Sequence, residues 1–422
     1  MIAAPIAQRY NNAMLDFPRG FPIQALLLLV SLPLQMYLFG QVRRYLNERI
    51  ADANLLTKLT FLLACCFVLM HLPLAGRVFF GTHAFPPSSI ISQGFFTASS
   101  IWVVGSIGSA LILLGYNLFQ RFILLLRRPE GAEPDAARRQ FLTKGAGMAA
   151  AVPFMVSGYG ALLERRRFEV DHLDIPCGAL SSELAHLTLV QLTDLHVGPF
   201  MSAEELAAYV EAANRLKPDL IALTGDFVAG SEDEVEPCVT TLAGLKARYG
   251  VFACIGNHDI YAHAADKLAF RFKEKGIQTL RNAAVTLEVA GSKLSMLGID
   301  DLRTGRPDLP RALRRAETDP GELKILLSHR PEIFPQAAQA GVDLVLSGHY
   351  HGGQVKLSQS PESLSIARLL TPFAEGLFQL PRQESRAGKR AHLFVSRGVG
   401  ITGLPMRINC PPQIAHLTFK KA

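Results

Sequence analysis

The order of apolar and polar positions divides the chain into two regions with different periods. Four long apolar segments stand before residue 164, at residues 22–40, 59–80, 101–126 and 145–163. A helix needs roughly 20 apolar residues to cross a bilayer, and all four segments come near that length. Helices buried in a protein core are the alternative, but three such segments precede any pattern typical of a soluble domain. The pattern predicts an all-α transmembrane region of about four helices over residues 1–163.

From about residue 187 onward, short apolar runs alternate with amphipathic ones. Five runs have the length and composition of buried strands, at residues 187–193, 219–224, 251–255, 323–328 and 343–347. Helical spacing of apolar residues occurs at 202–217, 234–246 and 264–275, and further strands are expected at 285–289, 293–298, 393–396 and 413–419. We therefore expect an α/β domain over residues 187–422, with residues 164–186 as a linker and entry to it.

The net charge of +7 belongs to the first region. Residues 1–163 hold 13 basic and 6 acidic residues, whereas residues 164–422 hold 30 of each. Because the basic residues flank apolar segments, they indicate a lipid bilayer as partner, and no nucleic acid is expected. The oligomeric state leaves no mark in the sequence. The disulfide state also stays open for the cysteines outside the apolar segments, which lack metal-binding spacing: Cys177, Cys238, Cys254 and Cys410.

The basic residues also predict an orientation. They cluster after the first apolar segment, at residues 43–58, and after the third, at residues 127–144, and such clusters favour the cytoplasmic side. The domain after residue 163 would then lie outside, on the periplasmic side of a bacterial inner (plasma) membrane that the chain crosses several times. Three arginines at residues 165–167 argue against this orientation.

Residues 138–144, RRQFLTK, resemble a bacterial twin-arginine signal, R-R-x-F-L-x-K, and a weakly apolar run follows them. Such signals are addresses that a receptor reads. An ordinary cytoplasmic basic cluster is the other interpretation, and both stay open. Both place this cluster inside and the following domain outside.

Each of the five predicted buried strands ends in polar residues. These are Asp194 and His196, Asp226, the triplet Asn257, His258 and Asp259, His329, and finally His349 and His351. In an open α/β sheet, ligands bind beyond the carboxyl ends of the strands. We therefore expect these five clusters, which are distant in sequence, to meet in one crevice.

The chemistry of these residues suits divalent metal ions. Carboxylate oxygens and imidazole nitrogens are the ligands that hard and borderline ions prefer. Asp194 and His196 lie two residues apart, as do His349 and His351, so that each pair would point to one side if the strand geometry persisted. Asp226 has two oxygens and can bridge two ions.

The order D-x-H, G-D, G-N-H-D, H and G-H-x-H resembles the calcineurin-like metallophosphoesterase superfamily over residues 187–355. The resemblance implies a four-layer α/β/β/α sandwich with two mixed sheets. The tail at residues 396–419 resembles a membrane-associated bacterial subgroup, which includes exported twin-arginine phosphoesterases and relatives that act on lipid-linked nucleotides.

The resemblance also implies roles for single residues. One metal ion would be held by Asp194, His196, Asp226 and His351, and a second by Asp226, Asn257, His329 and His349. His258 would donate a proton to the leaving oxygen or stabilise the phosphoryl charge, and Asp259 would orient the ring of His258. The identity of the ions, Mn²⁺, Zn²⁺ or Fe, is not fixed by mixed nitrogen and oxygen ligands.

The expected activity is therefore hydrolysis of a phosphoester bond by a hydroxide that two metal ions activate. A phosphodiesterase is the first hypothesis, because a diester needs help with its leaving group. A pyrophosphatase-like hydrolase of a lipid-linked nucleotide at the cytoplasmic face is the second. A catalytically silent, membrane-anchored binding module is the third. Loops determine the substrate, and the sequence leaves it open beyond a phosphoester, whether lipid-linked or not.

Overall fold

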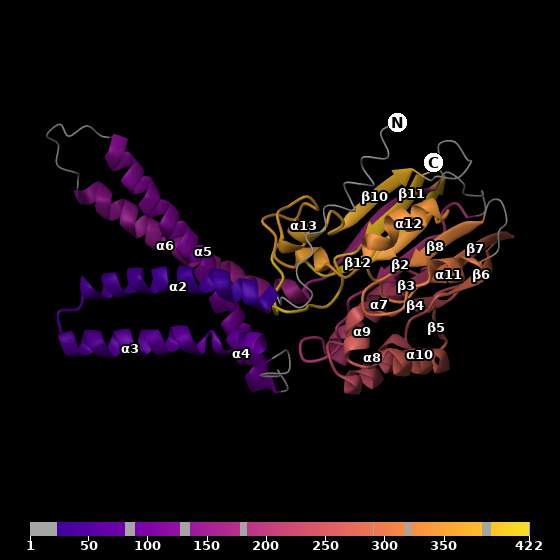
Figure 1. The fold of residues 1–422 in the computed structure, drawn as a ribbon, viewed down its shortest axis with the longest axis horizontal. Coiled ribbons are helices and arrows are strands. Elements are labelled where there is room, and N and C mark those ends of the chain that lie inside the picture. Colours follow the sequence, from indigo (N-terminus) through magenta and orange to yellow (C-terminus); the bar gives the residue numbers. More distant parts are fainter. Residues whose placement is uncertain are drawn as a thin grey trace. The chain divides into compact units, whose positions relative to one another are not determined.

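The computed structural model describes residues 23–80, 89–126, 136–177, 184–289, 291–316, 322–381 and 390–421. These residues form two compact units (Figure 1). The helical unit comprises described residues up to Leu163 together with Gly403–Met406. The α/β unit comprises the described residues of Glu164–Thr402 and those from Arg407 onward.

The helical unit consists of α2 (Ile23–Asn47), α3 (Ala53–Leu69), α4 (Leu72–Phe80), α5 (Ile90–Leu126) and α6 (Ala136–Leu162). Within the described residues, three helical stretches are long and apolar enough to cross a membrane: Ala53–Gly76, Ile90–Ile123 and Gln140–Arg166. They contain or overlap the second, third and fourth predicted segments. The first predicted segment forms most of α2, apart from Pro22, which lies outside the described residues. The helix of the third predicted segment, residues 101–126, begins earlier than predicted, at Ile90, because polar and small residues continue it.

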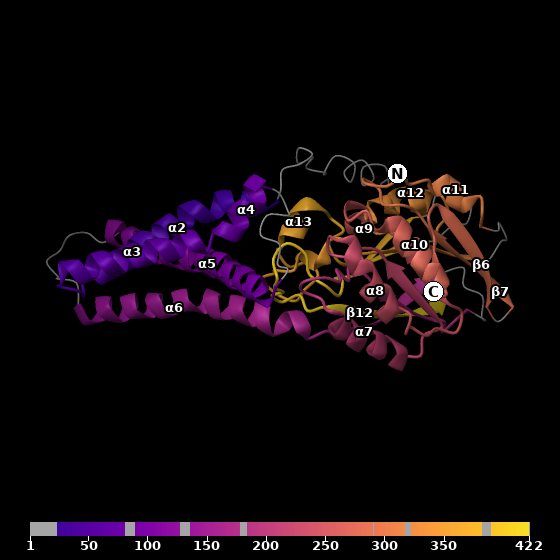
Figure 2. The same ribbon diagram turned by 90° about the horizontal axis from the view of Figure 1, so that it is seen from below.

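Small and polar side chains join the long helices α5 and α6, which run side by side (Figures 1 and 2). A Cβ atom on Gly105 would lie 2.5 Å from the ring of Phe154, so glycine permits this close approach. Between α5 and α2, Trp102 Nε1 donates to Gln35 Oε1 at 3.0 Å. Small residues and interhelical hydrogen bonds are the features that join helices in a lipid environment. The segment at residues 138–144 is part of α6, and its role as a signal stays a prediction.

The described residues of the α/β unit form two six-stranded mixed sheets. The first has the order β1-β12-β2-β3-β4-β5, formed by Glu169–Cys177, Gln413–Lys421, Thr188–Leu192, Leu220–Thr224, Val251–Cys254 and Ile277–Thr279. The second has the order β10-β11-β9-β8-β7-β6, formed by Gly376–Pro381, Arg390–Val395, Leu344–Ser347, Leu323–Leu327, Ser292–Gly298 and Ala283–Val289. Strands β2 to β5 are parallel, as are β7, β8, β9 and β11.

Three apolar clusters make this unit a four-layer sandwich. One cluster lies between the sheets and includes Phe252 and Phe394, both almost fully buried. A second packs the first sheet against α7 (Ala203–Arg215), α8 (Val235–Leu242) and α10 (Ala265–Glu274). A third packs the second sheet against α11 (Leu309–Leu313) and α12 (Phe334–Gln339). The α/β/β/α architecture that the sequence predicted is therefore confirmed, and Figure 1 shows the helices on the outer faces.

Three strands have no counterpart in the sequence prediction. Strand β1 pairs in parallel with β12 over nine residues and lies within the predicted linker and entry at 164–186. Strand β1 lies at the edge of the first sheet and is partly exposed to solvent. Its sequence, EVDHLDIPC, therefore mixes charged residues with apolar ones. Strands β5 and β10 are short or partly exposed, and such runs give a weak periodic signal.

Candidate metal centre

The loops that follow strands β2, β3, β8 and β9, together with the start of α9 (Asn257–Tyr261) after β4, bring the predicted residues together. In the described chain, three groups of side chains offer ligand atoms that all lie within 4.8 Å of one another. The first is Asp194, His196 and His351, the second Asp226, His329 and His349, and the third His196, Asp226 and His258.

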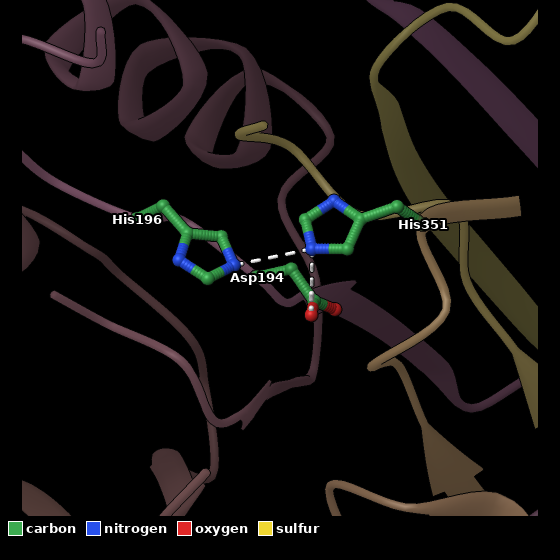
Figure 3. A group of neighbouring side chains, drawn as sticks. All are labelled: Asp194, His196 and His351. Carbon is green, nitrogen blue, oxygen red and sulfur yellow. Dashed lines mark hydrogen bonds and ion pairs between the residues drawn. The ribbon is translucent and has the colours of Figure 1, made fainter. Parts of the chain in front are cut away.

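The first group is drawn in Figure 3. The Nε2 atoms of His196 and His351 face each other at 3.1 Å. His351 Nε2 also lies 3.2 Å from Asp194 Oδ1. All three residues are buried, with at most 3% of their surface exposed. Two ring nitrogens and a carboxylate oxygen therefore converge on one point that is buried from bulk solvent.

The second group has a similar arrangement. His329 Nε2 lies 3.2 Å from Asp226 Oδ2 and 3.2 Å from His349 Nδ1. The other ring nitrogen of His329, Nδ1, lies 2.8 Å from the carbonyl oxygen of Thr224. That contact places the donor hydrogen on Nδ1 of a neutral ring and leaves Nε2 to bind a cation.

One oxygen of Asp226 lies close to ring nitrogens of both groups. Asp226 Oδ2 lies 3.6 Å from His196 Nε2 in the first group and 3.2 Å from His329 Nε2 in the second. The other oxygen, Oδ1, accepts a hydrogen bond from the backbone N–H of His258 at 2.8 Å. Asp226 is therefore held so that Oδ2 points between the two positions, as a bridging ligand must.

The convergence does not come from strand alternation, because the extended strand geometry does not persist as far as these residues. Strand β2 ends at Leu192, before Asp194 and His196, and the two residues have φ values of 54° and 49°. His349 and His351, which follow β9, have φ values of 77° and 51°. Left-handed backbone conformations of this kind are uncommon outside glycine and are often found at functional sites.

Two glycines give the carboxylates their space. A Cβ atom on Gly348 would lie 2.1 Å from Asp194 Oδ2, and one on Gly256 would lie 2.2 Å from Asp226 Oδ1. Neither distance is possible for real atoms. The glycines before His349 and Asn257 are therefore required by the close approach of backbone and carboxylate.

His258 and Asp259 do not interact as the sequence predicted. The His258 ring places Nδ1 3.0 Å from the carbonyl oxygen of Ala229, and its plane lies edge-on to His196. The Asp259 carboxylate instead accepts backbone hydrogen bonds from the loop after β3 and from Gly256. Ala229 therefore orients the ring of His258, and Asp259 holds the loop that carries Asp226.

The charges in the second group depend on one another. Burial alone would raise the pKa of Asp226, but the imidazoles around it hold the pKa well below its ordinary value. Burial alone would lower the pKa of His329, but the Asp226 carboxylate raises it to about 10. Burial and the nearby Arg330 lower the pKa of His349 far below its usual range. His329 therefore carries a proton at neutral pH when no other cation balances Asp226.

The donor set fits divalent metal ions. Facing imidazole nitrogens at 3.1 and 3.2 Å can share a hydrogen, and they can hold a divalent cation when both present their lone pairs. Two buried carboxylates complete the sets with oxygen ligands. Asn257 is also buried, and its Oδ1 is linked to His349 through Arg330.

Two arginines at this centre escaped the sequence analysis. Arg330 directly follows His329, and its guanidinium contacts Asn257 and His349. Arg407 is fully buried and donates to the carbonyl oxygens of Arg397, Gly398, Gly400 and Cys410, which closes the loop before β12. Adjacency to a predicted ligand was a signal for Arg330, whereas nothing in the sequence distinguishes Arg407.

Comparison with known proteins decides the family. A model of the calcineurin-like phosphoesterases matches residues 187–353. The uncharacterized metallophosphoesterase YkuE of Bacillus subtilis is 30% identical over 295 residues, which cover 67% of this chain and 98% of that protein. The chain belongs to the calcineurin-like metallophosphoesterase family. The chain is accordingly a hydrolase of phosphoester bonds, and members of this family generally use a centre with two metal ions.

Two vertebrate relatives of this metallophosphoesterase carry the name transmembrane protein with metallophosphoesterase domain. The protein of Danio rerio is 29% identical over 322 residues, covering 74% of this chain and 70% of its own length. That of Bos taurus is 26% identical over 384 residues, covering 85% and 82%. Together with the three membrane-capable helices, these relatives indicate that this metallophosphoesterase associates with a membrane.

Proposed function

We propose that this metallophosphoesterase is a phosphodiesterase with two divalent ions, Mn²⁺ in the first instance. One ion is held by Asp194, His196, Asp226 and His351, and the other by Asp226, Asn257, His329 and His349. The proposal is supported by the position of Asp226 Oδ2, which lies within 3.6 Å of His196 Nε2 and 3.2 Å of His329 Nε2. Two divalent ions at such a centre would neutralise charge on phosphoryl oxygens. They would also lower the pKa of water, which supplies a hydroxide as the nucleophile for phosphorus.

The observation that carries the choice of a diester is the placement of His258. Its Nδ1 lies 3.0 Å from the carbonyl oxygen of Ala229, an acceptor that fixes a hydrogen on Nδ1. Nε2 is then the atom that exchanges a proton, and the ring lies 4.6 Å from that of His196, centroid to centroid. We infer that Nε2 donates a proton to the departing alcohol oxygen, which helps a poorly activated leaving group most.

The test uses the full chain, purified in detergent and loaded with Mn²⁺. We expect bis(p-nitrophenyl) phosphate to be hydrolysed faster than p-nitrophenyl phosphate. A higher rate on the monoester would contradict the choice of a diester. No turnover of either compound, or of a broad panel of phosphoesters, would support a catalytically silent binding module instead.

We further propose that the catalytic domain, residues 187–422, works on the periplasmic side of a bacterial inner membrane that the chain crosses several times. The basic residues between the apolar segments support this orientation. The arginines at residues 165–167 favour the opposite one, in which a pyrophosphatase-like enzyme cleaves a lipid-linked nucleotide in the cytoplasm. An alkaline phosphatase reporter fused after the last residue should be active only for the periplasmic orientation, and an inactive fusion that is expressed at a normal level would contradict it.

A further inference from the structure

A guanidinium lies between the side chains proposed to hold the second ion. Arg330 is only 6% exposed. Its Nη1 lies 2.5 Å from His349 Nε2, and its Nη2 donates to Asn257 Oδ1 at 3.1 Å. Its Nε donates to Asp301 Oδ2 at 2.8 Å. Two of its three partners are therefore groups that would also bind a metal ion.

Asp301 anchors one end of this guanidinium. Its Oδ1 accepts hydrogen bonds from the backbone N–H of Thr304 at 2.9 Å and from the hydroxyl of Thr304 at 2.7 Å. Its Oδ2 accepts from Arg330, and the side chains of Arg330 and Asp301 are 7% and 0% exposed. The ion pair fixes the Nε side of Arg330, and the two Nη atoms face the metal centre.

A neutral imidazole has one lone pair in the plane of its ring, so His349 cannot serve an ion and Arg330 together. Its Nδ1 faces His329 Nε2 at 3.2 Å, which makes Nδ1 the nitrogen on the side of the second position. When the lone pair of Nδ1 binds a cation, Nε2 carries the hydrogen. Two donors, His349 Nε2–H and Arg330 Nη1–H, would then face each other. The Nη atoms have to turn away from His349 while Asp301 retains Nε.

From this conflict we infer that Arg330 binds the phosphoryl group of the substrate. An ion at the second position takes His349 and Asn257, the acceptors of both Nη atoms, and a buried guanidinium N–H without an acceptor is costly. A phosphoryl oxygen at the same centre restores an acceptor, and the planar fork of arginine suits two such oxygens. Asp301 is a positioning residue. The inference rests on the two-ion site proposed above.

This role gives two effects of opposite sign when Arg330 is replaced by a neutral residue. The second ion should bind more tightly, because a competing cation leaves His349 and Asn257. Phosphate should bind less tightly, because two charged donors leave the centre. A variant that is merely misfolded loses affinity for both, so the pair of signs separates the proposed role from structural damage.

The experiment compares the wild type with Arg330→Gln and Arg330→Lys in the full chain, freed of metal with a chelator. Arg281→Gln is the matched control, because Arg281 pairs with the neighbouring carboxylate of Asp300 and its side chain is 35% exposed. Free Mn²⁺ is measured by electron paramagnetic resonance during titration. Inorganic phosphate binding to the loaded proteins is measured by calorimetry.

For Arg330→Gln we expect tighter binding of the second Mn²⁺ and about 10- to 100-fold weaker phosphate binding, the range for charge-assisted hydrogen bonds. Unchanged phosphate affinity, or weaker binding of the second Mn²⁺, would overturn the inference. If Arg330→Gln lacks a cooperative melting transition, the test uses Arg330→Lys instead. The phosphate affinity of this variant should fall because lysine lacks the planar guanidinium. A phosphate affinity equal to that of the wild type would refute phosphoryl binding by Arg330. If the wild type binds fewer than two Mn²⁺, the proposed function is overturned as well. If it binds two Mn²⁺ and replacing Arg330 has no effect, only this inference is overturned.

Discussion

The two groups of side chains at the metal centre differ in how their charge is balanced. In the first, the Nε2 atoms of His196 and His351 face each other beside Asp194. Arg407 contacts His351 at its other ring nitrogen, with Nη2 at 3.4 Å from Nδ1. In the second, Arg330 enters between Asn257 and His349. The second group therefore contains a cation of the chain between its ligand atoms, whereas Arg407 contacts the first group only at His351 Nδ1.

Two positions built largely from carboxylates and imidazoles therefore need not be equivalent. A cation that enters the second position has to displace the guanidinium of Arg330 and the proton of His329. We expect the two ions to bind with different affinities, the first more tightly. The predictions below test this asymmetry and the oxygen that joins the two positions.

The largest effect is expected for Asp226→Asn, which removes the charge shared by both positions. Loss of one ion removes neutralisation of phosphoryl charge, so kcat on bis(p-nitrophenyl) phosphate should fall by about 10³-fold or more. Asp266→Asn is the control, because the Asp266 side chain is 94% exposed and lies outside all three groups. A kcat within threefold of wild type for Asp226→Asn would refute the shared ligand.

A somewhat smaller effect is expected at His258, which packs against His196 of the first group. His258→Gln should slow a diester with an alkyl leaving group by about 10²- to 10⁴-fold, the usual contribution of a general acid. The same change should barely affect a p-nitrophenyl leaving group, which departs without a proton. Steady-state kinetics on both diesters measure the ratio, and equal losses on the two would rule out proton donation.

The pH dependence of metal binding should separate the two positions. In the metal-free protein the pKa of His329 is raised from 6.5 to about 10, so an ion at the second position displaces a proton at neutral pH. Its affinity should therefore rise by up to about tenfold per pH unit until pH approaches 10. Burial lowers the pKa of His196 well below 6.5, so this ring needs no deprotonation for binding at the first position.

Calorimetric titrations in buffers with different ionisation enthalpies test this difference. Proton release should accompany the second Mn²⁺ and be smaller for the first. Equal proton release at both positions would contradict the assignment of the displaced proton to His329.

The smallest effect is expected for Gly348→Ala. Its Cβ would overlap Asp194 Oδ2, so the carboxylate has to shift, and we expect a loss of about 1–3 kcal/mol in stability. The affinity for the first Mn²⁺ should fall more than the affinity for the second. Gly230→Ala is the matched control, since a Cβ there has no neighbour within 4 Å. Wild-type melting and metal binding in Gly348→Ala would show that the close approach is not required.

The sequence predicted the strands and the residues that meet after them, because buried parallel strands are short apolar runs and their carboxyl ends share one edge. It could not predict how Asp194 and His196 converge, since left-handed backbone depends on tertiary contacts. The family resemblance assigned Asp259 to the ring of His258, but the carboxylate satisfies buried backbone N–H groups of the loop after β3.

Arg330 shows a second limit of sequence reasoning. Arginine beside a ligand is usually a solvent-exposed residue, and only the fold places Asp301 and Asn257 around this one. Edge strand β1 was missed for a related reason, since its exposed face carries charged residues that obscure the apolar pattern. Contacts between distant segments decide both cases.

The most direct test of the account is the electron paramagnetic resonance spectrum of the full chain loaded with Mn²⁺. An oxygen of Asp226 shared by two ions predicts two Mn²⁺ per chain with a spin-coupled signal, and loss of that coupling in Asp226→Asn. A single ion per chain, or two ions with uncoupled spectra in the wild type, would contradict a bridged centre.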